Sequence, residues 1–488
     1  MSVSRREVLG SSVALLASHA ATKVVQAQDA GSDERATYGA ASTGLGMTSD
    51  LARFLSGIQY EDLSPEAVHE AKRAVLDWIG CALAGSAHPT VKVLLATLDE
   101  IGSVPVATVL GQGGRKLSLL DAPVANGQMG HVLDFDDTHL GGVILHTSTA
   151  TLPALFALGE RRRASGRDLV AAFAAAFEAG IRVGRAAPRH HEGGWHLTGT
   201  LGTVAAAAGS ARLIGLDERQ TVFALGIACT QAAGMQQNRG TDCKSLHAGK
   251  SGYHGVLASM LASQGFDSSP EILEGRLGFT KIYSAAQQND AIVADLGGTW
   301  MIASNGYKPY ACGVVLHPLV DAMIEVSRKT GQPASQVERV EVLVHPDVIR
   351  ITGIDDPGSG LMSKFSANHA AAVAYIDQAG GVVQFTDERA DDPIVRALRT
   401  VTQVKREPLF RLDQATAIVR TRSGSTHEAQ IEHATGTAAN PMSDQTLGEK
   451  FSGNAAPVVG AERTRRIADM IWNLDTLEDI GDLVRACA

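Results

Sequence analysis

Apolar residues recur at spacings of three and four along most of the chain from Thr48 onward, with short turns between the runs. This spacing predicts amphipathic helices. The first clear start is Ser64-Pro65-Glu66, where a serine suited to cap a helix precedes a proline at the first helical position, and it predicts a helix through Ala84. Residues 150–280 are rich in alanine and glycine, which allows helices to pack closely. The chain is therefore expected to be mainly α.

Residues 106–110 predict a short strand before a glycine-rich turn, and alternation of apolar and polar residues with a period of two becomes frequent after Gly306. Residues 337–344 alternate as a strand, and two further alternating runs within 415–432 predict a hairpin that turns at Ser423-Gly424. The helical spacing returns after Asn440-Pro441. A unit of mixed α and β structure is thus predicted to interrupt the helical part of the chain.

These patterns divide the chain into five segments. We expect a large all-helical domain into which a smaller α+β lid domain is inserted, preceded by an export signal and a flexible leader. The predicted segments are the signal (residues 1–27), the leader (28–47), the first part of the helical domain (48–305), the lid domain (306–440) and the C-terminal part of the helical domain (441–488).

The N-terminus has the features of a twin-arginine export signal. Ser4-Arg5-Arg6 precedes a mildly apolar run, and Val25-Gln26-Ala27 supplies the small residues that precede a cleavage site. The mature chain would then begin near Gln28 and act in the periplasm. An ordinary N-terminal tail is the alternative interpretation.

Composition and charge exclude several classes of function. The formal net charge is −9, and loss of three basic residues and one acidic residue with the signal leaves −11. Such a chain has no basic surface for nucleic acid, and no run after the signal is long and apolar enough to span a bilayer, so neither is expected as a partner. The five cysteines contain no CxxC pair, which indicates neither a disulfide framework nor an iron–sulfur cluster.

Carboxylates and imidazoles gather between Asn126 and Ser148 in an otherwise lightly charged region. Read as a helix, this stretch places His131, Asp134 and Thr138 on one face, so that Asp134 and Thr138 would contact one bound molecule. A solvated, capped helix end is the ordinary interpretation. A metal site is a third possibility, although no HExxH or comparable ligand spacing is present.

The same stretch resembles the signature of the MmgE/PrpD family, through the pattern NGxxxHxLDFDDTH followed by HxS. Later blocks resemble further family motifs in the same order, and the match runs from about residue 48 almost to the end. These blocks are Gly194 to Gly199, Lys244 to Gly249, Gly265 to Gly275, Lys308 to Cys312 with His317, and Lys364-Phe365-Ser366.

This resemblance implies a metal-independent enzyme without a cofactor, with a small di- or tricarboxylic acid as its substrate and a second copy of the chain as its partner in a homodimer. The family includes 2-methylcitrate dehydratases, cis-aconitate decarboxylases and an iminodisuccinate epimerase. Their reactions begin or end with a proton on the carbon next to a carboxylate. Such chemistry needs cations that hold carboxylates and positioned groups that move the proton.

The family motifs assign roles to six residues of this chain. The catalytic residues they imply are Asp134, Thr138, His146 and His196, and the substrate carboxylates would be held by Lys244 and Lys308. Asp134 is expected to orient His146 or to accept a hydrogen bond from it. Asp136 and Asp137 are expected to cap or solvate a helix end.

One position departs from the decarboxylases of the family, which carry a histidine where this chain has Gly313. Formation of itaconate is therefore in doubt, and a lyase that eliminates water is the favoured activity, with decarboxylation next. An epimerase that moves an α-proton would use the same residues. A periplasmic carboxylate-binding protein would need the lysines but not the histidines. Tyr310, Cys312 and His317 lie nearby in sequence without an assigned role.

Overall fold

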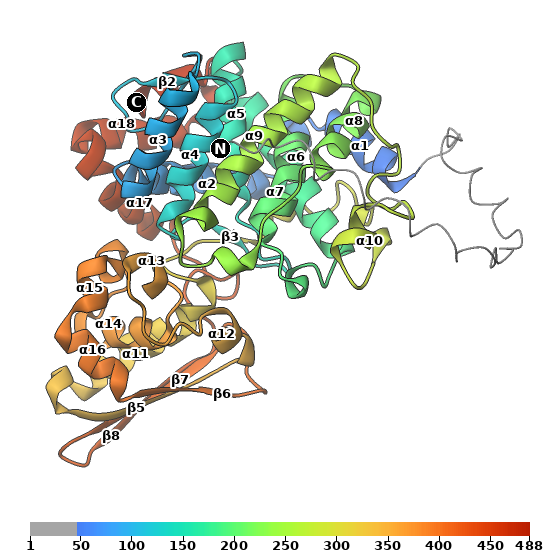
Figure 1. Ribbon diagram of the computed structural model, residues 1–488. Helices are drawn as coiled ribbons and strands as arrows, with labels where there is room; N and C mark the ends of the chain where they lie inside the picture. The colour runs from blue at the N-terminus through green and yellow to red at the C-terminus, as the bar shows by residue number, and fades with distance from the viewer. Residues whose placement is uncertain (1–45) are drawn as a thin grey trace, which may run out of the picture. The chain divides into compact units, whose positions relative to one another are not determined.

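The computed structural model describes residues 46–488 of the chain. The predicted signal and nearly all of the predicted leader lie outside the described residues. The last residue of that leader, Met47, already opens the first helix, α1 (Figure 1).

Most of the described residues lie in helices, so the prediction of a mainly α chain is confirmed. The cap predicted at Ser64 is present, since its hydroxyl accepts a hydrogen bond from the amide of Ala67. The helices before residue 305 and after residue 440 are α1 (Met47–Gly57), α2 (Pro65–Gly85), α3 (Pro89–Ile101), α4 (Asp121–Val132), α5 (Thr147–Arg162), α6 (Gly166–Ala186), α7 (Leu197–Leu213), α8 (Glu218–Cys229), α9 (Asp242–Ser263), α10 (Phe279–Tyr283), α17 (Asp444–Val459), α18 (Ala461–Trp472) and α19 (Gly481–Ala486).

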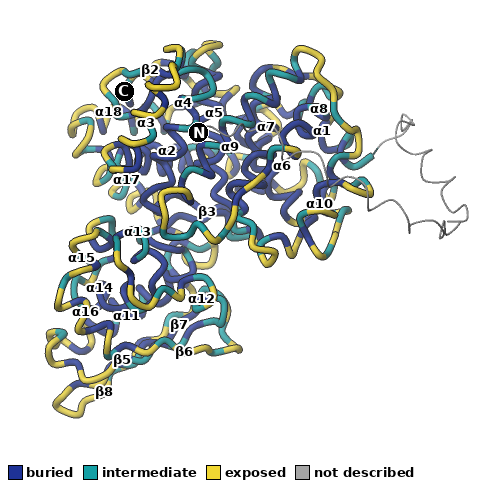
Figure 2. Tube along the Cα trace, in the orientation of Figure 1, coloured by how far each residue is buried: buried dark blue, intermediate teal, exposed yellow. Residues whose placement is uncertain are grey.

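Glycines let α9 pack closely against its neighbours α4 and α7. A Cβ on Gly249 would lie 2.2 Å from the carbonyl oxygen of Val124, and one on Gly255 would lie 2.4 Å from Cβ of Ala206. Both contacts are too short for any side chain, so these glycines are needed where they stand. Figure 2 shows the buried residues that run along α5, α6 and α7.

Two short antiparallel strand pairs lie outside the four-stranded sheet. One closes a tight turn, and the other joins parts of the chain that lie far apart in sequence. β1 (Ala107–Thr108) pairs with β2 (Lys116–Leu117), and β3 (Thr138–His139) pairs with β4 (Asn305–Gly306). In the second pair Thr138 lies opposite Gly306. This register brings the segment after Gly306, which carries Lys308, next to the segment that carries Asp134.

A four-stranded sheet lies within residues 337–431, in the order β6-β5-β7-β8. The predicted strand and hairpin are confirmed, whereas β6, which pairs parallel to β5, was not predicted. Figure 1 shows α11 and α14 over this sheet, and both contact its strands. The bounds are β5 (Val337–Val344), β6 (Thr402–Arg406), β7 (Ala415–Thr421), β8 (Thr426–Ile431), α11 (His317–Thr330), α12 (Pro346–Ile351), α13 (Gly360–Ser363), α14 (Ala367–Asp377), α15 (Asp387–Asp391) and α16 (Pro393–Thr400).

The sheet and its helices form a hydrophobic cluster of their own, which also takes in Cys81, Val132, Leu133 and Phe135. The last three of these residues surround the turn that carries Asp134, so the α+β segment packs directly against that turn. After residue 440 the chain returns to the helices, where α17 packs against α2. A lid domain with the bounds 306–440 stays a prediction.

Within residues 46–488, no single helix is both long and apolar enough to cross a membrane. Taken together, α2 and α3 have the required length and composition, but a break between them bends the pair by 83°.

Candidate active site

Asp134 lies on a turn rather than on a helix. Helix α4 ends at Val132, and Asp134 adopts a left-handed backbone conformation with φ of 50°. Aspartate is one of the few residues that tolerate this region, and a helix cannot continue through it. The prediction of one helix from His131 to Thr138 was therefore wrong. The turn sends Thr138 into β3, and the side chains still meet, but through tertiary contacts.

The carboxylate of Asp134 pairs with two lysines. Its Oδ1 accepts hydrogen bonds from Nζ of Lys244 at 3.0 Å and from Nζ of Lys308 at 2.9 Å. Burial alone would raise the pKa of Asp134, but the two ammonium groups outweigh burial and hold this pKa well below its ordinary value. Oδ2 of Asp134 is buried and has no hydrogen-bond partner among the residues that the structure describes. An ionised acceptor is thus left without a donor.

The tautomer of His146 is set by its surroundings. Nδ1 of His146 lies 3.0 Å from the main-chain carbonyl oxygen of Asp137 and 3.1 Å from Oδ2 of Asp136. A carbonyl oxygen only accepts, so Nδ1 carries the hydrogen and Nε2 keeps a lone pair. Oγ1 of Thr138 lies 3.1 Å from the same Nδ1. His146 therefore has the tautomer that a general base requires.

Asp136 and Asp137 are fully buried, and the prediction that they cap or solvate a helix end was wrong. Asp136 accepts from Nδ1 of His131 at 2.9 Å, and it lies beside His146. The expectation that Asp134 would pair with His146 is also corrected, since Asp136 takes that position. Burial would raise the pKa of Asp136, but the two imidazoles hold it well below its ordinary value.

Asp137 has a separate, structural set of partners. Its Oδ2 accepts from the hydroxyl of Ser148 at 2.5 Å and from the amide of Asn305 at 2.6 Å. Burial and the neighbouring carboxylate of Asp77 raise the pKa of Asp137 well above its ordinary value. Asp134 and Asp137 depend on partners distant in sequence, such as Lys244 and Asn305, which spacing within the motif does not reveal.

Two histidines that sequence reasoning left out of the site belong to it. His131 donates from Nδ1 to Asp136 and accepts at Nε2 from Nζ of Lys244 at 3.0 Å, which makes it neutral. Nδ1 of His247 lies 2.9 Å from Nδ1 of His196, so one donates and the other accepts. The available signals were positional: His131 comes three residues before Asp134, and His247 three residues after Lys244.

Ring contacts join these histidines into one group. The centroid of His131 lies 4.6 Å from that of His146 and 5.7 Å from that of His196, and His196 lies 5.1 Å from His247. Burial lowers the pKa of His131 and of His247 to about 4, and it lowers the pKa of His196 well below its ordinary value. These three rings are therefore neutral at pH 7.

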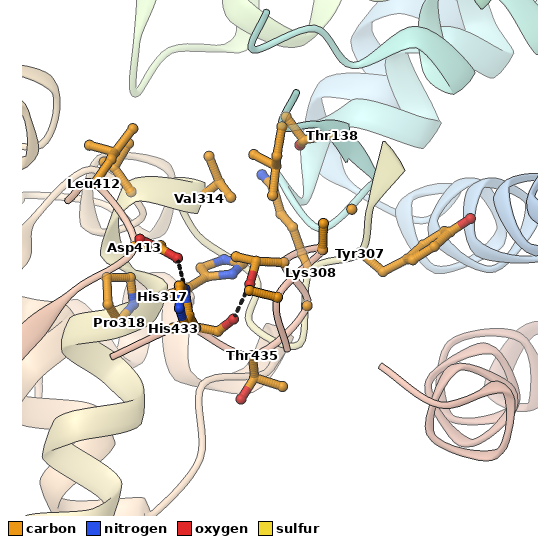
Figure 3. Close-up of a pocket in the computed structure, with 18 of the residues that line it drawn as sticks. Thr138, Tyr307, Lys308, Val314, His317, Pro318, Leu412, Asp413, His433 and Thr435 are labelled. Atoms are coloured by element: carbon orange, nitrogen blue, oxygen red, sulfur yellow. Dashed lines mark hydrogen bonds and ion pairs between the residues drawn. The ribbon is translucent and has the colours of Figure 1, made fainter. Parts of the chain in front are cut away.

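A narrow cavity of about 10 Å³ lies beside these groups and is lined by His131, Asp134, Lys244, Lys364 and Phe365, among others. A larger pocket, of about 390 Å³, is lined by Thr138 and Lys308 together with Val314, His317 and Leu412 (Figure 3). Its ion pair, His433 with Asp413 at 2.6 Å, is half exposed. We assign the active site to the smaller cavity, because the carboxylate of Asp134, the ammonium groups of Lys244 and Lys364 and the ring of His131 meet there.

The segment 310–317 supports the site through its backbone. The carbonyl of Cys312 accepts from Nζ of Lys308 at 3.2 Å, and the amide of Gly313 donates to the carbonyl of Lys364 at 3.0 Å. A Cβ on Gly313 would lie 3.4 Å from Thr352. The hydroxyl of Tyr310 donates a hydrogen bond to Asp321 and not to Asp134. The ring of His317 is buried, and its Nε2 has no hydrogen-bond partner among the described residues.

Three ligand atoms suited to a metal ion lie within 4.8 Å of one another, on His131, Asp136 and His146. The same nitrogen atoms already make hydrogen bonds, at 2.9 Å to Asp136 and at 3.0 Å to a carbonyl. The ammonium of Lys244, at 3.0 Å from His131, would repel a divalent cation here. These atoms are therefore better explained as two imidazoles that share the carboxylate of Asp136 than as ligands of a metal ion.

Comparison with known proteins places almost the whole chain in one family. Residues 49–291 match the MmgE/PrpD N-terminal domain, and residues 310–476 match the MmgE/PrpD C-terminal domain. The chain is 27% identical to a cis-aconitate decarboxylase of Aspergillus terreus over 469 residues, which cover 90% of this chain and 95% of the relative. It is 25% identical to the cis-aconitate decarboxylase of Homo sapiens over 455 residues, which cover 90% and 93%, respectively.

Proposed function

The chain belongs to the MmgE/PrpD family, and from this premise we propose that it is a lyase that removes water from a small hydroxy di- or tricarboxylic acid. The family and the relatives support a decarboxylase or a dehydratase in general. The choice of dehydration is the proposal, and it rests on the hydrogen bonds of the site.

The arrangement of His146 and Asp136 carries the proposal. With Nδ1 held by Asp136 and by a main-chain carbonyl, Nε2 of His146 is the base that removes a proton from the carbon next to a substrate carboxylate. The imidazolium that forms is stabilised by the buried charge of Asp136. The negative charge that develops on the substrate carboxylate is stabilised by the neighbouring ammonium groups, in a site with little water.

The unpaired Oδ2 of Asp134 supports a hydroxy acid as substrate. A buried carboxylate oxygen without a donor is costly, and the hydroxyl of a hydroxy acid supplies that donor. A fully ionised unsaturated acid offers acceptors only. When the C–O bond breaks, Lys244 donates the proton that turns the leaving hydroxide into water. Burial lowers the pKa of this lysine, which favours proton donation, and its Nζ is hydrogen-bonded to Asp134.

Decarboxylation is the second candidate, because the relatives that cover nine-tenths of the chain are named as decarboxylases. The same cations would stabilise the carbanion left by carbon dioxide, and an acid would then protonate it. The absence of a side chain at Gly313 weighs against this reaction.

Incubation of the purified protein in deuterated water with citrate-like, aconitate-like, tartrate-like and amino-dicarboxylate acids, followed by proton NMR, tests the proposal. An alkene signal that grows from a hydroxy acid supports dehydration. Loss of carbon dioxide from an unsaturated tricarboxylate, or deuterium uptake without net conversion, would replace dehydration by decarboxylation or epimerisation. Binding without any reaction would indicate a carboxylate-binding protein instead.

Export by the twin-arginine pathway to the periplasm and assembly as a homodimer are also proposals. Replacement of Arg5 and Arg6 by lysine should leave uncleaved precursor in the cytoplasm, because the transport receptor reads the arginine pair. Light scattering of the purified protein measures its oligomeric state.

A further inference from the structure

We propose that Lys364 is the residue that anchors a substrate carboxylate, whereas Lys308 holds Asp134 in place and does not bind substrate. The inference deepens the proposed function, and it rests on that function for the reaction that takes place in the cavity. The K-F-S segment that contains Lys364 was noted in the sequence only as a motif, without a role.

The number of unused hydrogen-bond donors separates the three lysines. An ammonium group has three donors. Lys308 uses all three, to Oδ1 of Asp134, to the carbonyl of Asp134 and to the carbonyl of Cys312. Lys244 uses two, to Asp134 and to Nε2 of His131. Lys364 uses one, to the carbonyl of Ala311 at 2.9 Å. Lys364 therefore has the greatest capacity to bind an anion.

Lys364 is also the buried lysine without a carboxylate. Lys244, Lys308 and Lys364 are at most 9% exposed, and the first two lie within 4 Å of the carboxylate of Asp134. No carboxylate of the described residues lies within that distance of Lys364. An ammonium that is 3% exposed and lacks a counter-ion is costly, and burial lowers its pKa to about 8. A ligand carboxylate would supply the missing charge.

Lys364 lines the cavity on a well-defined main chain, with its Nζ 5.3 Å from the ring centre of Phe385. Lys364 follows α13 and precedes Ser366, which caps α14, so its main chain is fixed on both sides. It lines the same cavity as Asp134 and Lys244, and Nζ of Lys244 lies 5.2 Å from the ring centre of Phe365. A carboxylate bound to Lys364 would place the carbon chain of the acid beside Oδ2 of Asp134 and the remaining donor of Lys244.

The balance of charge favours an acid with more than one carboxylate. The three ammonium groups face the ionised carboxylates of Asp134 and Asp136, with neutral rings at His131 and His196. The ammonium groups thus outnumber the ionised carboxylates by one among these residues. A second substrate carboxylate would offset this excess positive charge, whereas a monocarboxylate could pair with only one of Lys364 and Lys244.

Calorimetric binding of tricarballylate tests this inference, because that acid has three carboxylates but no hydroxyl to eliminate. Lys364→Met should weaken its binding on the order of 10- to 100-fold, as expected when hydrogen bonds to a charged group are lost, and Lys364→Arg should restore part of it. Lys250→Met is the matched control. Lys250 also bonds a single carbonyl, that of Gln231, and has a pKa that burial lowers to about 8, but it does not line the cavity.

Melting curves identify the variants that are folded, and Lys364→Gln replaces Lys364→Met if the latter does not fold. Wild-type affinity in a folded Lys364→Met or Lys364→Gln variant, an equal loss in Lys250→Met, or no binding to the wild-type protein at millimolar concentration would overturn the inference. Because tricarballylate is not converted, the outcome is independent of the NMR assay. If Lys364→Met weakens binding but no hydroxy acid is dehydrated, the proposed function fails and the inference about Lys364 stands. If a hydroxy acid is dehydrated but Lys364→Met binds tricarballylate normally, the inference about Lys364 fails and the proposed function stands.

Discussion

Oδ2 of Asp136 lies 3.1 Å from Nδ1 of His146, and neither carboxylate oxygen of Asp136 is exposed to solvent. The carboxylate therefore lies beside the imidazole in a low-dielectric environment, where the electrostatic interaction between charged groups is stronger than in water. Before proton transfer, the carboxylate of Asp136 holds the hydrogen on Nδ1 of His146, so that Nε2 is free to accept a proton. After the transfer, its negative charge stabilises the imidazolium. The proposed acid/base chemistry depends on this pair.

Asp136→Asn should lower kcat on the order of 100-fold or more, because it removes the charge that supports the general base while nearly preserving shape. Steady-state kinetics on the substrate identified by NMR measures the effect. Asp137→Asn is the matched control, since Asp137 is a neighbouring buried aspartate whose carboxylate accepts from Ser148 and Asn305 rather than from His146. Equal losses in the two variants would speak against a special role for Asp136.

Asp134→Asn should lower stability by about 3–5 kcal/mol, the range for removal of one partner from a buried ion pair. The loss leaves Lys308, which is 1% exposed, without its counter-ion. The double variant Asp134→Asn/Lys308→Met should recover part of this stability, because it removes an uncompensated charge. Denaturant titrations of the two single variants and the double variant measure the coupling, and strictly additive effects would show that the pair does not interact as described.

Stability should fall as the pH is lowered from about 6.5 toward about 4. Burial lowers the pKa of His131 and of His247 from 6.5 to about 4, so in this window the unfolded chain binds protons that the folded chain does not. Their contribution is fully present above the unfolded pKa and is lost as the pH approaches the folded one. Melting temperatures across this range test the prediction, and His247→Gln should flatten the curve. A melting temperature that stays constant throughout would contradict it.

Treatment with a chelator should leave turnover unchanged. The nitrogen atoms of His131 and His146 that face Asp136 are used in hydrogen bonds, and Lys244 adds a positive charge beside them. Activity after dialysis against EDTA, together with elemental analysis of the dialysed protein, measures the dependence. Loss of activity that returns with added zinc would instead identify His131, Asp136 and His146 as ligands.

Local patterns were sufficient to predict much of the fold. The cap at Ser64, the strand β5 and the hairpin β7–β8 depend on residues close in sequence, and all three are present. The strand β6 was missed because its residues, TQVKR, are mostly polar and its pairing with β5 spans more than 50 residues. Parallel pairing of this kind leaves no local signal.

The geometry of the candidate site could not be predicted from the motifs. Family motifs pointed to Asp134, His146 and the two lysines, which do lie together, but no spacing shows that Asp134 leaves the helix with φ of 50°. A partner more than 100 residues away, Lys244, helps to keep Asp134 ionised. Such contacts exist only after the chain has folded.

Deuterium exchange of a substrate proton tests the central claim most directly, because it follows the single step assigned to His146. In deuterated water, the wild-type protein should place one deuterium on the carbon next to a carboxylate in recovered substrate or product, as measured by NMR and mass spectrometry. His146→Gln should bind tricarballylate like the wild-type protein and yet exchange on the order of 100-fold or more slowly. A His146→Gln variant that exchanges this proton at the wild-type rate would contradict the account.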